Sequence, residues 1–407
     1  MNIAQFSKLM YTIFKQDPID IGYIEKQGLL AVKIGQTFAL RIDFLDVERC
    51  NALSKLYDAT TIIPAEDAKI AITTALSPAA ANAFSSIDYT PLASASVGQV
   101  HPATLKDGSD VVIKFIKHDF AEQFEKDVRS VKRLMRFAIT FYPTLARVAD
   151  PIGILDHIEQ YTVKELNLQH EYEGQQLLKK IHEENTSKYD LSLLRFPHVY
   201  PEYSNERVLV SERLHGETFD QLLDRGALSY DQLLQLFHLH GFYLFAQGTF
   251  HGDLHPGNII YQDDHIYFID TGAISTVSDR IRTGLFFFFS ALSRYDYEEC
   301  AHFLNQMAQT RISGKAFETF RDQFIELYKD FTNSTVSQVS LTQKMMQTIK
   351  LGVRSGMQFD RGMFPIIKSM MYLDGMVLRC NPNAKLLEDM RPFVEEMQRT
   401  HPLTPLE

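Results

Sequence analysis

The spacing of apolar and polar residues divides the first half of the chain into helical and β-rich segments. Over residues 1–88, apolar side chains recur at helical spacing, which predicts a series of helices. Residues 89–118 predict two strands joined by a hairpin turn at Asp107 and Gly108, because an Asp-Gly pair favours a tight turn between two strands. Helical spacing returns over residues 119–184.

The second half of the chain is mainly helical, with short strands in places. Strands are predicted at 196–203 and 207–214, and again within residues 251–272, where a loop precedes two strands that flank an Asp-Asp turn. From about residue 279 the apolar spacing is helical again. This order predicts an α+β protein with a helical extension, a small β-containing lobe with a helical insert and a larger helical lobe, with limits at 1–88, 89–212 and 213–407.

Composition and charge restrict the setting of the protein. The net charge of −10 argues against nucleic-acid binding through a general positive field. The cysteines Cys50, Cys300 and Cys380 are too far apart for a metal-ligand spacing, so we expect reduced thiols in a cytoplasmic protein. No signal-peptide pattern is found at the N-terminus. The most apolar run, residues 285–292, is shorter than the roughly 20 residues that span a bilayer, so a buried helix is predicted there.

The strongest chemical pattern is HGDLHPGN at residues 251–258, followed by a strand that ends in IDTG. Phosphoryl transfer from ATP requires a carboxylate that orients the attacking hydroxyl or water, and oxygen ligands that hold Mg²⁺ against the phosphates. Taken singly, an Asp or Asn in such a segment more often caps a helix or turn. Together, Asp253, Asn258 and Asp270 have the order found in kinase-like enzymes. We therefore predict that Asp253 is catalytic and that Asn258 and Asp270 bind Mg²⁺.

A lysine lies within the apolar strand VVIKF. Lys114 would be unfavourable there unless its ammonium group has a partner, or unless the strand is at an edge and the lysine faces water. In kinases the equivalent lysine binds ATP phosphates and pairs with a helix Glu. We expect Glu171 to be that partner and to act with Lys114 in catalysis, with Glu165 and Glu173 as alternatives.

The segment before this strand takes the place of the glycine-rich phosphate loop of kinases. It contains Ala93, Ser94, Ala95 and Ser96 in place of a GxGxxG pattern, and these residues are predicted to bind the nucleotide. Small side chains let backbone N–H groups approach phosphates, and the serine hydroxyls add donors. Alanine restricts the backbone more than glycine does, so we expect a stiffer loop.

These motifs together resemble the UbiB/AarF family of atypical kinase-like proteins, from about residue 25 to about residue 280. The KxGQ motif of that family corresponds to Lys33-Ile34-Gly35-Gln36, and PLASASVGQVH resembles its alanine-rich loop. The resemblance implies a two-lobed protein-kinase-like fold in which the KxGQ helix covers the cleft against large protein substrates. It also implies that Lys33 and Gln36 lie near the nucleotide and that Glu212 lies at the hinge that meets adenine.

Two positions depart from the family pattern. Asn167 stands where the ExD motif has its second acid, and an amide cannot form the same ion pair with the KxGQ lysine. Thr271 replaces the Phe of Asp-Phe-Gly, so the Phe-packing switch of ordinary kinases is absent. The C-terminal membrane-spanning helices of some family members are not found, so we expect any membrane association to be peripheral.

The sequence therefore predicts an atypical kinase-like, Mg²⁺-dependent ATPase or a lipid or small-molecule kinase, with ATP and Mg²⁺ as cofactors. The resemblance implies a role in ubiquinone or isoprenoid-lipid metabolism, with an isoprenoid lipid, a quinone precursor or quinone-biosynthesis enzymes as partners. No nucleic-acid partner is expected. Two alternatives stay open. One is an aminoglycoside- or choline-type phosphotransferase, against which the KIGQ extension counts, and the other is a nucleotide-binding scaffold with little turnover.

Two conspicuous features have ordinary structural interpretations. We expect His251 to hold the catalytic loop, because it has no set of metal-binding partners in the sequence. The Met-rich residues 363–378 are predicted to form the core side of a helix rather than a lipid-binding segment.

Overall fold

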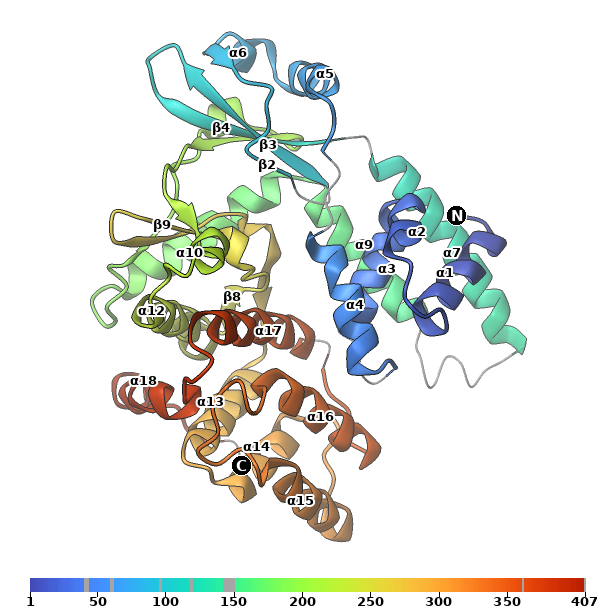
Figure 1. Ribbon diagram of the computed structural model, residues 1–407, viewed down its shortest axis with the longest axis vertical. Coiled ribbons are helices and arrows are strands. Elements are labelled where there is room, and N and C mark those ends of the chain that lie inside the picture. The colour runs from blue at the N-terminus through green and yellow to red at the C-terminus, as the bar shows by residue number, and fades with distance from the viewer. Residues whose placement is uncertain are drawn as a thin grey trace. The chain divides into compact units, whose positions relative to one another are not determined.

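A computed structural model gives the fold of the chain, which divides into two compact units. The first unit comprises Met1–Glu173 and Pro197–Arg213, and the second comprises Gly174–Phe196 and Leu214–Glu407. The chain thus passes into the second unit within helix α10 (Gln169–Asn185), returns to the first unit between Phe196 and Pro197, and leaves it again after Arg213. The structure describes residues 1–39, 44–58, 62–94, 97–117, 120–141, 151–360 and 362–405 (Figure 1).

Helices make up most of the N-terminal part of the first unit. α3 (Leu29–Ala39) packs against α4 (Val47–Asp58), α7 (Phe120–Phe141) and α9 (Pro151–Glu165). The remaining helices described in this unit are α1 (Ile3–Phe14), α2 (Ile21–Lys26), α5 (Ala65–Ala75) and α6 (Pro78–Ala81). The helical prediction for residues 1–88 is confirmed, except that its last part forms the strand β1 (Phe84–Ile87).

The sheet of the first unit has the strand order β1-β3-β4-β6, with β2 paired to β3. Its other strands are β2 (Ala93–Ser94), β3 (Gly98–Leu105), β4 (Asp110–Ile116) and β6 (Val208–Glu212), and all the pairings are antiparallel. The predicted hairpin turn lies between β3 and β4, where Gly108 has φ +91°. Val111, Ile113 and Phe115 of β4 are buried in the core shared with α5, so Lys114 between them projects from the other face.

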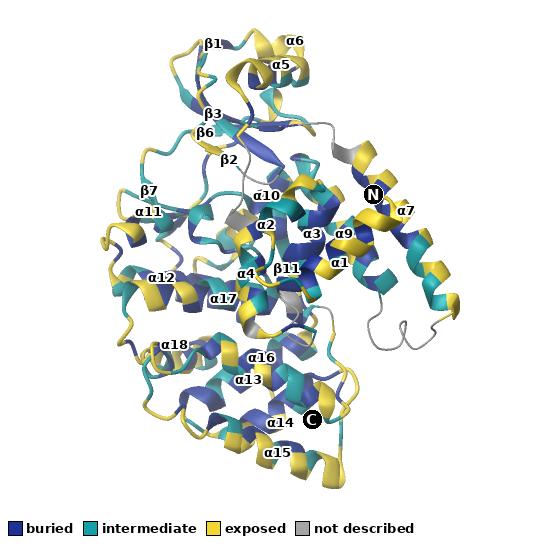
Figure 2. Ribbon diagram, turned by 45° about the vertical axis from the view of Figure 1, so that its right-hand side comes forward, coloured by how far each residue is buried: buried dark blue, intermediate teal, exposed yellow. Residues whose placement is uncertain are grey.

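The second unit is largely helical and has a core rich in Phe and Leu. The predicted buried helix at 285–292 lies within α13, where Leu285, Phe286 and Leu292 are buried. Residues 363–378 lie within α17, whose Met370 and Met376 are buried, so the core prediction is confirmed. Exposed residues follow the outer faces of these helices (Figure 2). The helices are α11 (Phe219–Asp224), α12 (Tyr230–Gly241), the π-helix η2 (Phe242–Gln247), α13 (Asp279–Ser293), α14 (Tyr297–Met307), α15 (Gly314–Tyr328), α16 (Leu341–Arg354), α17 (Met363–Cys380) and α18 (Leu386–Thr400).

Two small sheets of the second unit carry the HGDLHPGN and IDTG segments. One sheet has the order β5-β10-β9-β7, and the other pairs β11 with β8. In the predicted turn between β9 and β10, Asp263 and Asp264 have φ of 49° and 59°, a left-handed conformation that Asp tolerates better than most residues. The strands are β5 (Leu194–Arg195), β7 (Glu217–Thr218), β8 (Thr249–His251), β9 (Ile259–Gln262), β10 (His265–Phe268) and β11 (Ile274–Thr276).

The prediction of a strand at residues 196–203 is wrong. The segment makes an isolated bridge from Val199 to Ser211 and then forms the short 3₁₀ helix η1 (Pro201–Tyr203). Pro197 and Pro201 have no N–H group, so this aromatic segment cannot donate a continuous ladder of hydrogen bonds.

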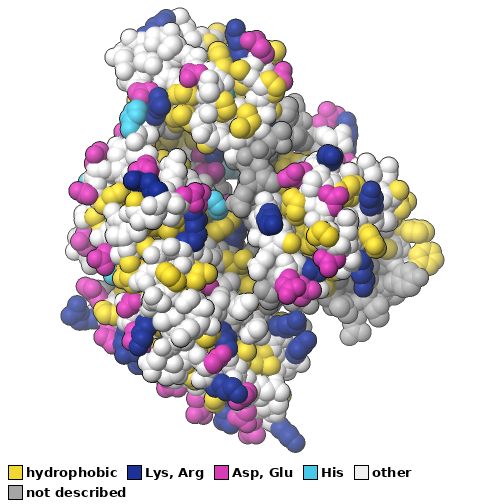
Figure 3. Space-filling view, viewed as in Figure 1, with side chains coloured by type: hydrophobic (Ala, Val, Ile, Leu, Met, Phe, Trp, Pro, Cys, Tyr) yellow, Lys and Arg dark blue, Asp and Glu magenta, His cyan; other side chains and the backbone are white. Residues whose placement is uncertain are grey.

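The order of helices and strands among the described residues is that of an α+β protein with a helical N-terminal part and a largely helical C-terminal part. No helix among the described residues combines the length and apolar character needed to cross a bilayer. On the face shown in Figure 3, basic and acidic side chains are interspersed with apolar ones.

Candidate functional site

Lys114 and Glu171 form an ion pair in the first unit. Nζ of Lys114, on β4, lies 2.6 Å from Oε2 of Glu171, in the first turn of α10. The two side chains are only 14% and 10% exposed, so water screens their attraction weakly. Of the two alternative acids, Glu173 contacts His170 at 3.1 Å and is largely exposed, whereas Glu165 pairs with a different lysine.

The alanine-rich loop begins beside this lysine. β2 (Ala93–Ser94) pairs with the start of β3, which pairs in turn with the end of β4. A Cβ atom on Gly98 would lie 3.2 Å from a backbone oxygen of β4 and 3.7 Å from Cε of Lys114, so the absence of a side chain lets the strand pass close to the lysine. The predicted loop residues Ala95 and Ser96 lie outside the described residues.

Two polar residues that follow this loop hold the sheet to its surroundings. Oε1 of Gln99 accepts a hydrogen bond from the N–H of Ile63 at 3.1 Å, and its Nε2 lies 3.0 Å from Nε2 of His101. Burial lowers the pKa of His101, so the ring is neutral, accepts at Nε2 and donates from Nδ1 to the carbonyl of Asp88 at 3.1 Å. The QVH part of the motif therefore has a structural role.

The KIGQ segment is fixed by contacts within the first unit. Lys33 on α3 forms an ion pair with Glu165 at the end of α9. Nε2 of Gln36 donates to the carbonyl of Leu56 on α4 at 2.9 Å. A Cβ atom on Gly35 would lie 2.4 Å from Cδ1 of Leu56, so the glycine allows α3 and α4 to approach closely.

Asn167, the departure from the ExD motif, has a local role at the start of α10. Its Oδ1 accepts a hydrogen bond from the N–H of Gln169 at 2.9 Å. Because Glu165 supplies the acid that pairs with Lys33, the ion pair on the KIGQ lysine is present without a second carboxylate. With Asn167 in the third position of the ExD motif, Lys33 pairs with the one acid that the motif retains, Glu165.

Glu212 ends β6, close to the point where the chain enters the second unit after Arg213. Its Oε2 accepts a hydrogen bond from the N–H of His198 at 3.0 Å, and its own N–H donates to the carbonyl of His198 at 2.7 Å. These bonds fix the end of the strand. Contact between Glu212 and adenine stays a prediction.

Asn258 and Asp270 lie at the open end of the β9–β10 hairpin. The N–H of Ile269 donates to the carbonyl of Asn258 at 3.0 Å, which continues the strand pairing by one step. Asp270 follows with φ 54° and ψ 64°, a left-handed conformation that turns the chain into the 3₁₀ helix η4 (Thr271–Ala273). Nδ2 of Asn258 donates to the carbonyl of Asp253 at 3.1 Å, which leaves its side-chain oxygen as the atom able to bind a cation.

His251 connects the segments that carry the two acids. Its Nδ1 accepts a hydrogen bond from the N–H of Asp253 at 3.2 Å, and its Nε2 faces the carbonyl of Ile269 at 3.5 Å. Burial lowers the pKa of His251, although the charges of Asp253 and Asp270 act in the opposite direction. The ring is therefore neutral, with its proton on Nε2, and it holds the loop as predicted.

The IDTG segment packs directly on α10. A Cβ atom on Gly174 would lie 2.1 Å from the carbonyl oxygen of Thr271 and 2.9 Å from Cγ1 of Ile274. Only a residue without a side chain fits this contact. Thr271 itself is buried, so the position that carries Phe in ordinary kinases is part of the packed interior.

The sequence pattern did not single out Lys368, which lies beside Asp253. Nζ of Lys368, on α17, is 2.8 Å from Oδ1 of Asp253. Within the described part of the chain this oxygen has no aligned hydrogen bond, so the contact is an ion pair rather than a directed hydrogen bond. A signal was available, because Lys368 interrupts the apolar pattern of a predicted core helix.

Asn258 and Asp270 fit a magnesium ion by their chemistry. Mg²⁺ prefers oxygen ligands and is usually bound by one or two carboxylates together with substrate phosphates and water. One carboxylate and one amide oxygen match that partial set. The described residues contain no group of three or more His, Cys, Asp or Glu side chains suited to a metal, so the phosphates and water would have to complete the coordination.

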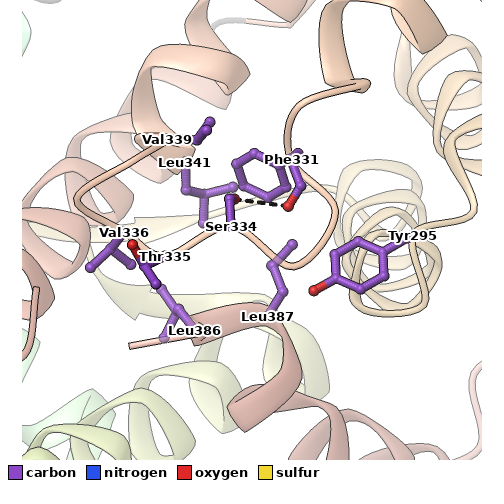
Figure 4. A pocket seen from close by; sticks show the side chains of 9 residues that line it. All are labelled: Tyr295, Phe331, Ser334, Thr335, Val336, Val339, Leu341, Leu386 and Leu387. Carbon is purple, nitrogen blue, oxygen red and sulfur yellow. Dashed lines mark hydrogen bonds between the residues drawn. The ribbon is translucent and has the colours of Figure 1, made fainter. Parts of the chain in front are cut away.

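A small cavity in the second unit does not involve any of the predicted residues. Its volume is about 20 Å³, close to the space that one water molecule needs. The hydroxyl of Ser334 in its wall donates to the carbonyl of Phe331 at 2.8 Å. The lining residues are Tyr295, Phe331, Ser334, Thr335, Val336, Val339, Leu341, Leu386 and Leu387 (Figure 4).

Known proteins resemble the chain over most of its length. The "Uncharacterized protein in hydrogenase 1 5'region" of Clostridium pasteurianum is 25% identical over 382 residues, covering 92% of this chain and 70% of that protein. The "Probable protein kinase UbiB" of Xylella fastidiosa (strain 9a5c) is 27% identical over 392 residues, covering 92% and 68%. That of Vibrio parahaemolyticus is 26% identical over 384 residues, covering 92% and 69%.

A solved structure and a family comparison agree with these relatives. The structure described as "The complex structure of Rv3197-erythromycin from Mycobacterium tuberculosis" has the same fold, with a TM-score of 0.54, 19% identity and 95% coverage of both chains. The ABC1 atypical kinase-like domain matches residues 55–304, which is more than half of the chain. The chain therefore belongs to the ABC1 atypical kinase-like domain family, as its KIGQ, alanine-loop and HGDLHPGN motifs predict.

Proposed function

We propose that this protein is a Mg²⁺-dependent, ATP-using enzyme of the atypical kinase type, either a phosphotransferase or an ATPase. The observation that carries the proposal is the arrangement of Asp253, Asn258 and Asp270 on one loop and hairpin, held by His251. Kinase-like enzymes use such a set to orient the nucleophile and bind the metal. Membership of the ABC1 family and the kinase names of the relatives support this proposal.

The residues of the first unit would bind and align the nucleotide. Lys114, held by Glu171, would contact the ATP phosphates through its ammonium group. The backbone N–H groups of the alanine-rich loop, residues 93–96, would add donors to the phosphates, and the end of β6 at Glu212 would meet adenine. Lys33 and Gln36 would lie near the nucleotide.

The residues of the second unit would serve the reacting groups. Asp253 would accept a hydrogen bond from the attacking hydroxyl or water and so orient its oxygen. Asn258 and Asp270 would bind Mg²⁺, which supplies charge neutralisation at the phosphates when bound. His251 would keep the loop in place without taking up a proton, because burial lowers its pKa.

The acceptor class that we propose is an isoprenoid lipid or a phenolic quinone precursor, with water as the acceptor if the protein is only an ATPase. The UbiB names of the relatives support a place in ubiquinone or related lipid metabolism. We further propose a cytoplasmic protein with peripheral membrane contact and quinone-biosynthesis enzymes as partners.

Phosphate release from Mg-ATP by the purified protein tests this proposal. The assay compares buffer with anionic vesicles that contain a quinone-precursor phenol. We expect turnover that rises with these vesicles and falls by at least about 100-fold in Asp253→Asn, because a neutral amide oxygen accepts the hydrogen bond of the nucleophile much more weakly than a carboxylate does. Asp263→Asn, in the exposed hairpin turn, is the matched control and should keep wild-type turnover.

The outcomes separate the candidate functions. Turnover that depends on Asp253 but is independent of the phenol, and that rises with an amino-alcohol acceptor, would favour a small-molecule phosphotransferase. Nucleotide binding without any turnover would overturn the enzyme proposal and favour a nucleotide-binding scaffold.

A further inference from the structure

Two residues of α17 contact the HGDLHPGN loop within the second unit. Lys368 lies 2.8 Å from Oδ1 of Asp253, and the ring of Tyr372 meets the ring of His255 edge to face at 5.1 Å. Lys368 and Tyr372 are four residues apart and so lie on one side of the helix. Nζ of Lys368 also lies 5.8 Å from the centre of the Tyr372 ring. One face of α17 therefore meets alternate residues of the loop.

Lys368 is unusually well buried for a lysine. Its side chain is 13% exposed and follows the buried Ile366 and Ile367 in a helix that packs on α11 and α12. Withdrawing an ammonium group from water is unfavourable unless a negative charge lies close to it. Asp253 supplies that charge, and the Asp253 side chain is itself 28% exposed, which leaves part of the carboxylate open to a ligand.

α17 is anchored independently of this contact. Oδ2 of Asp374 accepts hydrogen bonds from the hydroxyl of Ser340 at 2.7 Å and from the N–H of Thr342 at 3.2 Å, at the start of α16. Apolar packing against α11 and α12 adds to this anchor. The ammonium of Lys368 is therefore presented to Asp253 from a helix whose position does not depend on the loop.

We propose that Lys368 is a positioning residue for the catalytic carboxylate of Asp253. It holds Oδ1 by charge, so that the other carboxylate oxygen is presented in one orientation to the attacking hydroxyl or water. This inference rests on the proposed function. It also extends the site beyond residues 55–304, the part that matches the ABC1 domain, because α17 lies C-terminal to that match.

The test compares the Mg-ATP turnover of three lysine variants of this chain. Lys368→Met keeps the aliphatic volume and removes the charge, and Lys368→Arg keeps the charge. Lys344→Met is the matched control, because Lys344 is also 13% exposed and pairs with Asp330 at 2.6 Å, in an ion pair that has no part in the loop. Urea unfolding of each variant separates a loss of folded protein from a loss of turnover.

We expect Lys368→Met to lower kcat by about 10- to 100-fold, the range typical of lost positioning contacts, with the KM for Mg-ATP changed by no more than about twofold. Lys368→Arg should recover most of this loss, and Lys344→Met should keep the wild-type kcat. In the Asp253→Asn background, Lys368→Met should have no further effect, because Lys368 acts through Asp253.

Other results overturn the inference. A kcat of Lys368→Met equal to that of Lys344→Met, or an effect that multiplies with that of Asp253→Asn, would assign Lys368 a purely structural role. Absence of turnover in the wild-type protein would overturn the proposed function and, with it, this role of Lys368. If the wild-type protein turns over Mg-ATP and Lys368→Met has the same kcat, only the role of Lys368 is overturned and the proposed function stands.

Discussion

Replacing Glu171 by Gln removes the negative charge opposite Lys114 and keeps the shape of the side chain. The ion pair measures 2.6 Å, and both side chains are at least 86% buried from water. Loss of one partner of a buried pair destabilises a protein by about 3–5 kcal/mol where the remaining charge has no other compensation. Because the amide oxygen of Gln can still accept a hydrogen bond from the ammonium, we expect a smaller loss of about 1–3 kcal/mol.

The same change should weaken nucleotide binding. Without Glu171 the ammonium of Lys114 is no longer fixed, so we expect the KM for Mg-ATP to rise by about tenfold or more. Equilibrium urea unfolding and steady-state phosphate release measure the two effects. Glu173→Gln is the matched control, because Glu173 lies two residues further along α10, is 60% exposed and contacts only the half-buried His170 among the ion pairs described.

The control should lose no more than about 0.5 kcal/mol and keep its KM, as expected for an exposed pair. If Glu171→Gln behaves like Glu173→Gln in both assays, the ion pair does not organise the nucleotide-binding residues and the argument for Lys114 is wrong.

Further predictions concern packing and pH. Gly174→Ala should lower kcat by about tenfold or more, because its Cβ would lie 2.1 Å from the carbonyl of Thr271 and displace the IDTG segment; unchanged phosphate release would contradict this. Gly35→Ala should lower the free energy of unfolding by about 1–3 kcal/mol through its clash with Leu56, whereas Gly375→Ala, with no atom within 4 Å, should be neutral or stabilising in urea unfolding. Burial lowers the pKa of His240 from an ordinary 6.5 to about 3, so the unfolded chain binds a proton that the folded chain does not as pH falls below 6.5. The contribution of the neutral His240 to the free energy of unfolding should therefore be fully present above pH 6.5 and fall by up to about 1.4 kcal/mol per pH unit below it. A His240→Phe variant should lose less stability than the wild type between pH 7 and pH 5, and equal slopes would refute the assignment.

Local sequence patterns predict the parts of this site that depend on neighbouring residues. The alternation of VVIKF and the Asp-Gly turn predict β3 and β4, and therefore the face on which Lys114 lies. The HGDLHPGN and IDTG segments predict the hairpin that carries Asn258 and Asp270, because their strands are joined by a short turn. The choice of Glu171 has a different basis, because it lies 57 residues from Lys114 and is predicted by the kinase pairing of a strand Lys with a helix Glu. Its role in catalysis stays a prediction.

Contacts between distant segments could not be predicted in the same way. Lys368 reaches Asp253 only because α17 packs on α11 and α12, and no periodicity of the sequence specifies that packing. The false strand at 196–203 has the opposite cause: its aromatic residues favour a strand, but prolines interrupt the backbone donors that a sheet requires. A segment rich in aromatic residues therefore forms a strand only where its backbone N–H groups are available to a neighbouring strand.

The most direct test of the central claim, that Asp270 binds the magnesium of an ATP-using site, is phosphate release from Mg-ATP by Asp270→Ala beside the wild-type protein. The proposed site predicts magnesium-dependent turnover in the wild type and its loss in the variant, because the alanine provides no ligand for the cation. Turnover at the wild-type rate in folded Asp270→Ala would contradict the metal assignment and with it the proposed mechanism.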